Sequence, residues 1–454
     1  MKINFAIITF PGLNREKEAL IALERNKMRG EIFLWNENPK KLAKFDGFII
    51  PGGFSYEDRV RAGVIAAKDR LMETLRKFSE QNNKVLLGIC NGAQILIESG
   101  IVPFDTKTPT FALARNRRIK NNQVLGTGFY NTWIFVKNSA PEKKTAFNLF
   151  PEDKILHIPI AHAEGRFLAD ESTIEKIIGN KQNTFSYCTE QGEIKSDFPV
   201  NPNGAIKNLA GITNIAGNAM SFMPHPETFP SGDAIFQSIQ TWFTGKIYKS
   251  IKTQNNSLFS SKQTSKKIIV SKSNASIQKD NLSFEITAEL IITDNEAISA
   301  QNCLRDLGFK NIILQKKVWW KITPEQTKTI SELQQKEIAE KIVRSGEILN
   351  LEKENATLKI AKQEYSFSKT QGWITSLVSK KETTNPTWLV QEKEDFVGQA
   401  KKTNLTHRLK DLKIKEVQHG ILWEIKNTTK AEQEKILALN FFANPNSANL
   451  IKLF

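Results

Sequence analysis

Apolar positions in the first half of the chain alternate between short continuous runs and segments with helical spacing. The apolar runs are 3–10, 47–50 and 85–89. The helical segments that follow them are 16–29, 66–80 and 93–98, respectively. Strands that alternate with helices favour βα units around a mostly parallel sheet. Further apolar runs at 132–136, 155–160 and 219–223 are richer in strand formers. We therefore expect an α/β core with added antiparallel strands.

The hydrophobic pattern breaks down between residues 246 and 282, where Ser, Lys, Asn and Gln dominate. Such sequence buries too little apolar surface to offset the entropy lost on ordering it. We expect a polar linker at 246–282, with a short strand at 268–270. The linker separates a first domain at 1–245 from the rest, in agreement with a length of 454 residues, since a single core rarely exceeds about 300 residues.

The second half contains an internal repeat. Residues 304–322 match residues 409–425, each with Leu-x-x-Leu near a helix end and then a strand that carries Trp. Each copy is predicted to run strand, helix, strand, helix, short strand. The pattern indicates two small α/β modules of the βαβ type at 283–355 and 386–454. A connector at 356–385 joins them, and its structure is left open by the pattern.

Charge and hydropathy narrow the range of partners. The chain has 64 Lys and Arg against 48 Asp and Glu, a formal net charge of +16. Nucleic-acid binding would explain that charge, but the lysines are dispersed and no nucleic-acid motif accompanies them, so we expect no nucleic-acid partner. No stretch approaches the roughly 20 apolar residues of a membrane span, and the N-terminus has no signal-peptide cleavage site. We expect a cytoplasmic protein without a membrane partner.

The three cysteines are widely separated, without the spacing of a disulfide framework or a metal site. Cys188 and Cys303 read as packing residues, whereas Cys90 lies in a Gly-x-Cys-x-Gly turn between an apolar strand and a helix. Small neighbours suit a sharp turn that projects the thiol above a sheet. A helix N-terminus favours a thiolate and offers N–H groups to an oxyanion. Cys90 is therefore a candidate nucleophile, with a buried packing cysteine as the alternative.

A cysteine nucleophile needs a base and a group that orients the base. Of the five histidines, His225 follows an apolar strand between two prolines, and Glu227 stands two positions later. This spacing allows the carboxylate to hold the imidazole while the other ring nitrogen meets the thiol. An ordinary surface loop is the alternative.

These residues resemble class I glutamine amidotransferases and, within them, the glutaminase subunits of phosphoribosylformylglycinamidine synthase, from de novo purine biosynthesis. The resemblance covers residues 1–245 and rests on the segments 10–14, 45–56, 61–63, 88–96, 159–166, 201–204 and 223–227. The Pro-Gly-Gly, cysteine-turn and His-Pro-Glu elements are general to class I. The Phe-Ser-Tyr, Arg-Ala-Gly and Ala-His-x-Glu-Gly-Arg elements narrow the resemblance to this subunit.

The resemblance implies a flavodoxin-like sheet with a nucleophile elbow and a role for each matching residue. Cys90 would be the nucleophile, His225 the general base and acid, and Glu227 the orienting carboxylate. The N–H groups of Gly53 and Asn91 would form the oxyanion hole. The residues that would bind the substrate glutamine are Gly52, Phe54 and Gln94. No cofactor is implied for this chain, since ammonia would pass to a separate synthetase subunit that holds ATP and Mg²⁺.

Two departures follow the oxyanion loop, because Glu57 and Arg59 replace the usual glycine and aromatic residue. The two C-terminal modules resemble the small subunit of the same synthetase, which works as a dimer. The second copy has an Asn-Pro ending at 439–445 that the first copy lacks. A tandem fusion would supply the equivalent of that dimer within one chain, at high effective concentration beside the glutaminase.

The function that we expect is glutamine hydrolysis through a Cys90 thioester, with ammonia passed to the synthetase subunit. Another class I amidotransferase or cysteine hydrolase is one alternative, although the purine-specific elements disfavour it. A non-catalytic scaffold that bridges the synthetase complex is a second alternative. RNA binding through the positive charge is a third.

Overall fold

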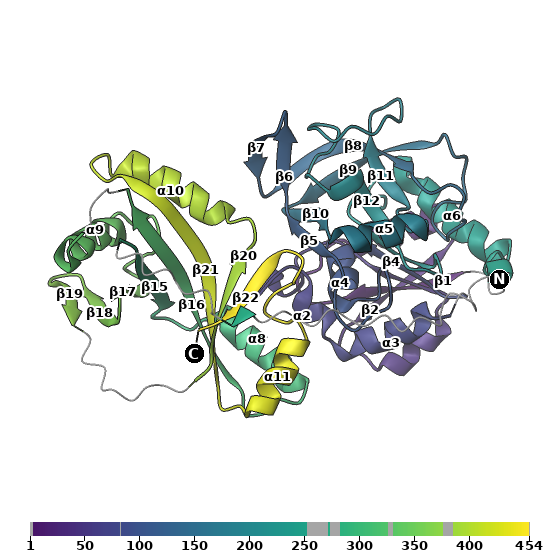
Figure 1. Cartoon of the computed structure of the whole chain (residues 1–454). Helices are drawn as coiled ribbons and strands as arrows, with labels where there is room; N and C mark the ends of the chain where they lie inside the picture. Colours follow the sequence, from purple (N-terminus) through teal and green to yellow (C-terminus); the bar gives the residue numbers. More distant parts are fainter. Residues whose placement is uncertain are drawn as a thin grey trace. The chain divides into compact units, whose positions relative to one another are not determined.

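The computed structural model describes residues 3–81, 83–251, 271–272, 282–325, 330–375 and 385–453. The chain divides into two compact units, Met1–Lys267 and Ile268–Phe454, which run from purple to teal and from green to yellow in Figure 1. Most of the predicted linker, including the strand expected at 268–270, lies outside the described residues. Its described parts include helix α7 (Tyr248–Ile251) and strand β14 (Ser271–Lys272).

A nine-stranded sheet forms the centre of the first unit, in the order β2-β1-β3-β4-β13-β12-β11-β8-β9. The strands are β1 (Asn4–Thr9), β2 (Arg29–Leu34), β3 (Gly47–Ile50), β4 (Val85–Ile89), β8 (Tyr130–Asn138), β9 (Ile155–His162), β11 (Phe185–Cys188), β12 (Leu209–Thr213) and β13 (Ala219–Phe222). The five strands β2, β1, β3, β4 and β13 lie next to one another, and each neighbouring pair among them is parallel. The pairs from β13 to β9 are antiparallel.

The sheet is therefore mixed, and the prediction of a mostly parallel sheet is wrong for its second half. We expected some added antiparallel strands, but we did not expect antiparallel pairs to be half of all strand pairs in the sheet. Only residues 214–218 join β12 to β13, too few for the crossover that parallel neighbours need. Two smaller antiparallel pairs flank the main sheet: β5 (Ala112–Arg115) with β10 (Glu164–Leu168), and β6 (Arg117–Lys120) with β7 (Gln123–Thr127).

Helices pack around the sheet of the first unit. They are α1 (Glu16–Arg25), α2 (Val64–Ala67), α3 (Arg70–Ser79), α4 (Asn91–Ser99), α5 (Glu171–Gly179) and α6 (Asp233–Thr244). Helix α3 is amphipathic and buries Leu71, Met72 and Leu75. Helix α4 differs because all nine of its residues are buried. An entirely buried helix has little freedom to shift, so α4 holds a fixed position at the end of β4.

The second unit is built on one nine-stranded sheet in the order β14-β22-β20-β21-β16-β15-β17-β18-β19. Its further elements are β15 (Phe284–Leu290), α8 (Asn295–Asp306), β16 (Ile313–Pro324), α9 (Glu332–Arg344), β17 (Glu354–Ile360), β18 (Gln363–Ser368), β19 (Gly372–Thr375), β20 (Thr387–Glu392), α10 (Phe396–Arg408), β21 (Ile414–Lys426), α11 (Lys430–Ala438) and β22 (Ala448–Lys452). The order of element types is the predicted one in both copies of the repeat.

The βαβ description of the modules is wrong, because the strands on either side of α8 pair antiparallel, as do those on either side of α10. Hydrophobic periodicity reports which face of a strand is buried and carries no information on strand direction. Residues 356–385 also contain more than a connector. Strand β17 pairs with β15 and completes the first copy, and β18 and β19 extend the sheet beyond it.

The two copies meet through β16 and β21, the long central strands of the second unit in Figure 1. Their pairing is centred on Val318 and Ile421, which are equivalent positions in the repeat. Equivalent residues face each other only when an approximate two-fold axis relates the copies. Two hydrophobic clusters contain residues of both copies, one with Ile286 and Val417 and the other with Trp319 and Leu422. The copies are therefore merged into one body.

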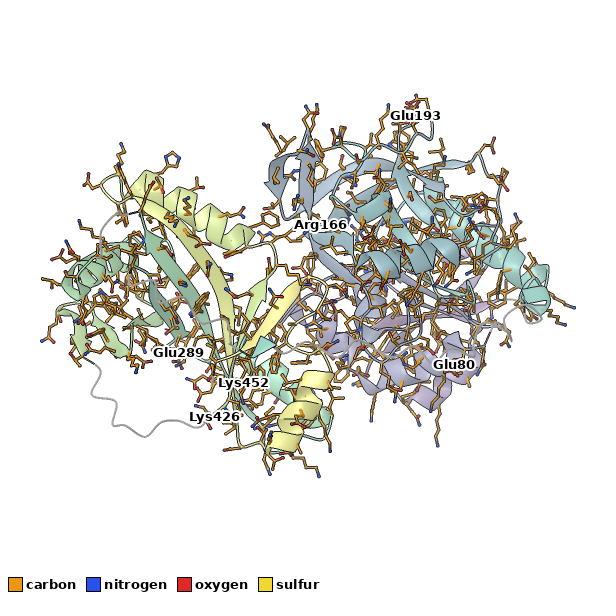
Figure 2. All side chains as sticks on the ribbon, in the orientation of Figure 1. Glu80, Arg166, Glu193, Glu289, Lys426 and Lys452 are labelled. Atoms are coloured by element: carbon orange, nitrogen blue, oxygen red, sulfur yellow. The ribbon has the colours of Figure 1, made fainter. Side chains whose placement is uncertain are left out.

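Polar contacts also join the copies. Lys426 Nζ donates to Gln315 Oε1 at 2.7 Å, and Gln315 Nε2 donates to Glu289. Figure 2 labels the two outer members of this chain of contacts, Glu289 and Lys426. The Trp320 and His419 rings contact each other across the central strand pair, with centroids 4.7 Å apart.

Within the described ranges, none of the helices has the length and apolar character needed to cross a membrane. The same residues contain no cluster of three or more His, Cys, Asp or Glu side chains placed to hold a metal ion.

Candidate active site

Cys90 occupies a sharp turn between β4 and α4. Its backbone has φ 51° and ψ −105°, a conformation that residues other than glycine rarely adopt and that is concentrated at functional sites. The Cys90 N–H donates to Phe222 O at 2.9 Å, so the end of β13 holds the turn in place. The side chain is 5% exposed.

Glycines on both sides of Cys90 make this turn possible. A Cβ atom on Gly92 would lie 1.9 Å from the Ile50 carbonyl oxygen, and one on Gly88 would lie 2.4 Å from the Gly92 carbonyl oxygen. Both contacts are with backbone atoms, which cannot move aside without shifting β3 or α4. The small residues predicted to flank the turn are thus required by the packing of the helix against two strands.

Replacing Gly92 by alanine should therefore destabilise the first unit, by at least about 2 kcal/mol, because the clash involves backbone in a fully packed core. Urea unfolding would measure the loss. Gly179→Ala is the matched control, because outside its chain neighbours and its own helix backbone no atom lies within 4 Å of the Cβ position. It should change stability by less than about 1 kcal/mol. Equal stabilities for the two variants would contradict the packing argument.

His225 and Glu227 lie together beside Cys90. His225 Nδ1 is 2.7 Å from Glu227 Oε1, and the two side chains belong to residues that are 4% and 1% exposed. Burial lowers the pKa of His225, but Glu227 and Cys90 raise it more, to about 10. Glu227 therefore favours the protonated form of the imidazole and fixes its orientation.

The loop at 51–56 brings a second set of groups to this pair. A Cβ on Gly52 would lie 2.9 Å from His225 Cε1 and 3.5 Å from Cys90 Cβ, so the Gly52 backbone packs against both. Gly53 has φ 145°, and a Cβ there would lie 2.6 Å from Leu13 Cα. The close approach and the positive φ together require glycine at this position.

Two backbone N–H groups are available beside Cys90. An antiparallel bridge joins Leu13 and Gly53. Its two hydrogen bonds run from the Phe54 N–H to Gly12 O at 2.9 Å and from the Asn14 N–H to Gly52 O at 3.2 Å. The bridge does not use the N–H of Gly53 itself. Asn91 is the first residue of α4, and the N–H groups in the first turn of a helix have no acceptor within the helix. Neither the bridge nor the helix uses these two N–H groups.

The Asn91 side chain ties these two donors together. Its Oδ1 accepts from the Ser55 N–H at 2.9 Å, and its Nδ2 donates to Asp58 Oδ1 at 3.0 Å. Residues 56–58 all have φ between 51° and 58°, which costs about 1–2 kcal/mol for each residue. Burial raises the pKa of Asp58 to about 6, against the opposing effect of the Asn91 hydrogen bond. Asn91 therefore holds a strained loop against α4.

The first unit also matches known proteins. Residues 2–261 match the family of CobB/CobQ-like glutamine amidotransferase domains. The phosphoribosylformylglycinamidine synthase subunit PurQ of Methanothrix thermoacetophila is 48% identical over 227 residues, which are 50% of this chain and 86% of that protein. The PurQ subunit of Pyrococcus furiosus is 36% identical over 226 residues, which are 50% of this chain and 88% of that protein.

The chain belongs to the glutamine amidotransferase family of the PurQ subunits. The predictions of a glutamine amidotransferase and of its class I fold are confirmed for the first half of the chain. A chain in the structure of PurLQS from Thermotoga maritima is 28% identical, with a TM-score of 0.42. The match covers 53% of this chain and 99% of that chain. The resemblance of the second unit to a small subunit stays a prediction.

The three residues predicted to bind substrate in the amidotransferase have different surroundings. Gly52 contacts the Cys90–His225 pair. Gln94 is buried, and both ends of its amide bind protein groups: Oε1 accepts from Asn91 Nδ2 at 2.7 Å, and Nε2 donates to Glu164 O at 2.6 Å. Phe54 is 51% exposed, so its side chain lies at the surface.

Strand β9 and the residues after it form a wall of the amidotransferase site that the sequence analysis did not assign. Pro159 O accepts from the His225 N–H at 2.9 Å, and Ala161 O accepts from Cys90 Sγ at 3.7 Å. Residues 159–166 served only as a marker of the family. Every residue has a carbonyl oxygen, so the type of residue does not reveal which carbonyl oxygens take part in the site. The family motif at 159–166 was the only indication in the sequence that this segment belongs to the site.

Proposed function

We propose that the amidotransferase hydrolyses glutamine at Cys90 and passes the ammonia to a separate synthetase chain that makes phosphoribosylformylglycinamidine. The observation that carries this proposal is the buried His225, which lies between Glu227 and Cys90. Membership of the PurQ family supports the choice of reaction and of partner.

The geometry of the site supports the following chemistry. Cys90 gives its thiol proton to His225, and its Sγ, at a nucleophile elbow, attacks the amide carbon of glutamine. The resulting oxyanion is bound by the N–H groups of Gly53 and Asn91. His225 gives its proton to the departing nitrogen, the C–N bond breaks, and ammonia leaves a thioester on Cys90. His225 then takes a proton from water, which attacks the thioester and releases glutamate. Glu227 holds the imidazole in place through both steps.

ATP and Mg²⁺ belong to the synthetase chain in this proposal, and the present chain contributes the nitrogen. Ammonia released into bulk water would be protonated and diluted, so the partner must cover the site. Cytoplasmic synthesis of purines is the setting in which we place the complex.

We propose further that the second unit takes the place of the small-subunit dimer of the same synthetase. The pseudo-two-fold pairing of β16 with β21 supports this assignment, as do the hydrophobic clusters that both copies share. A covalent link keeps the pair beside the glutaminase at any protein concentration.

The test is glutamate release from glutamine by the purified chain, alone and with its synthetase, ATP, Mg²⁺ and phosphoribosylformylglycinamide. We expect release that the synthetase and its substrates increase, because a bound partner favours the active conformation. Absence of release in the full mixture would contradict the proposal and leave a non-catalytic scaffold as the better description. Release that the synthetase leaves unchanged would point to another amidotransferase or a cysteine hydrolase.

A further inference from the structure

His162 is a buried histidine at the end of β9 that the proposed mechanism does not use. It is 3% exposed, and Ala161, the residue before it, accepts from Cys90 Sγ. The charge of His225 reaches the His162 ring and contributes to lowering its pKa. His162 therefore follows directly the β9 residue that contacts Cys90, and its ring is within reach of the charge of His225.

Of the two ring nitrogens of His162, Nδ1 has a hydrogen-bond partner and Nε2 has none among the described residues. Asn116 Nδ2 lies 3.1 Å from Gly128 O, 2.6 Å from His162 O and 3.1 Å from His162 Nδ1. It has only two hydrogens, and we assign them to the two carbonyl oxygens. Asn116 Oδ1 lies 3.2 Å from His162 Nδ1 and must accept the proton there. Nε2 then carries a lone pair, and among the described residues it is a buried atom without a hydrogen-bond partner.

A buried acceptor without a partner is costly, by roughly 1–3 kcal/mol, and a water or a ligand usually satisfies it. The surroundings are polar. Asn203 Nδ2 donates to Gly165 O at 2.8 Å and to Tyr187 Oη at 3.4 Å. A Cβ on Gly165 would lie 2.7 Å or less from three atoms of the His162 ring. Gly165 thus gives the ring its place in a buried polar cluster.

We propose that His162 Nε2 accepts a hydrogen bond from the amide nitrogen of the bound glutamine, and then from the ammonia that this nitrogen becomes. The proposal rests on the glutaminase function proposed above and assigns a positioning residue for its leaving group. The ligand is an uncharged nitrogen with N–H donors, which is the chemistry that an imidazole lone pair recognises.

The acceptor must itself stay unprotonated to do this. Burial, and after it the charge of His225, together lower the pKa of His162 to about 3. A protonated imidazole would give its proton to ammonia and trap it as ammonium. In thioester formation the only proton that reaches the nitrogen comes from His225. The C–N bond breaks, the S–C bond stays, and neutral ammonia departs from the lone pair of His162.

The discriminating experiment compares two substrates with different leaving groups. Glutamine offers N–H donors, whereas the γ-methyl ester of glutamate offers none before the bond breaks. In the complex with the synthetase, His162→Leu should lower kcat/KM for glutamine about tenfold, the worth of one hydrogen bond of about 1.4 kcal/mol. The same variant should leave kcat/KM for the ester within about twofold. His162→Gln, which keeps an acceptor near the Nε2 position, should recover most of the activity with glutamine.

Equal losses on both substrates would assign His162 a purely structural role and overturn the proposal, as would an unchanged rate with glutamine. A wild-type protein that hydrolyses neither substrate would contradict the glutaminase function instead. Because a leucine variant could fail to fold, a second measurement uses the intact histidine. In Cys90→Ala protein, saturating glutamine should shift the ¹⁵N resonance of His162 Nε2 in the direction expected for an accepted hydrogen bond. A resonance that does not move on saturation would also overturn the proposal.

Discussion

Cys90→Ala protein is expected to release glutamate from glutamine at least roughly 10⁴-fold more slowly than the wild type, because removal of the nucleophile leaves only binding and the oxyanion donors. The fold should survive, since the substitution removes one sulfur atom from a residue at a strand end. Alanine must adopt the same positive φ as Cys90, so it adds no new strain. Glutamate release by the complex with the synthetase is the measurement.

Two controls separate chemistry from assembly. Cys303→Ala removes a cysteine of the second unit that is partly exposed and should keep full activity. Supplying ammonium salts to the complex of Cys90→Ala protein should restore formation of the amidine, because the synthetase then needs no glutaminase. If Cys90→Ala protein still released glutamate at a tenth of the wild-type rate, another residue would be the nucleophile.

The residues that perform the proposed chemistry could be predicted because their side-chain types are informative. A lone cysteine between glycines marks a strand-to-helix turn, and the observed φ of 51° at Cys90 agrees with it. The spacing of His225 and Glu227 predicted one hydrogen bond, which measures 2.7 Å. In each case the sequence contained a residue that few other structural roles would require.

Features that depend on the backbone or on tertiary contacts could not be predicted. The wall formed by Pro159 and Ala161 acts through carbonyl oxygens, which every residue has. The Asn91 side chain was expected only to follow the nucleophile, yet it holds the strained loop at 56–58. Partners of this kind lie more than thirty positions apart in the chain, and a single sequence contains no record of such pairs.

The organisation of the second unit shows the same limit. The repeat gave the order of helices and strands correctly, because burial periodicity is local. It did not give the antiparallel direction of the strands, nor the inclusion of β17 in the first copy. The pairing of Val318 with Ile421 depends on how two distant segments meet. Two sequence modules thus became one sheet with two shared hydrophobic clusters.

Glu227→Gln is expected to lower glutamine turnover by roughly 10²- to 10⁴-fold, although glutamine can keep a hydrogen bond to His225. The substitution removes only the negative charge. Burial lowers the pKa of His225, and Glu227 is the first of the groups that offset it. Without that charge the pKa of His225 must fall from about 10, so that less imidazolium is present at neutral pH to protonate the departing nitrogen.

The sign of the effect makes this prediction specific. In the wild type, His225 should keep its proton as the pH rises to about 10, and in Glu227→Gln protein it should lose the proton at lower pH. Titration of the His225 ring resonances would follow both proteins. Glu190→Gln, at an exposed carboxylate, is the charge-matched control and should shift neither the titration nor the rate. A full rate in Glu227→Gln protein with an unshifted His225 titration would show that the carboxylate acts through shape alone, because the hydrogen bond would then suffice without the charge.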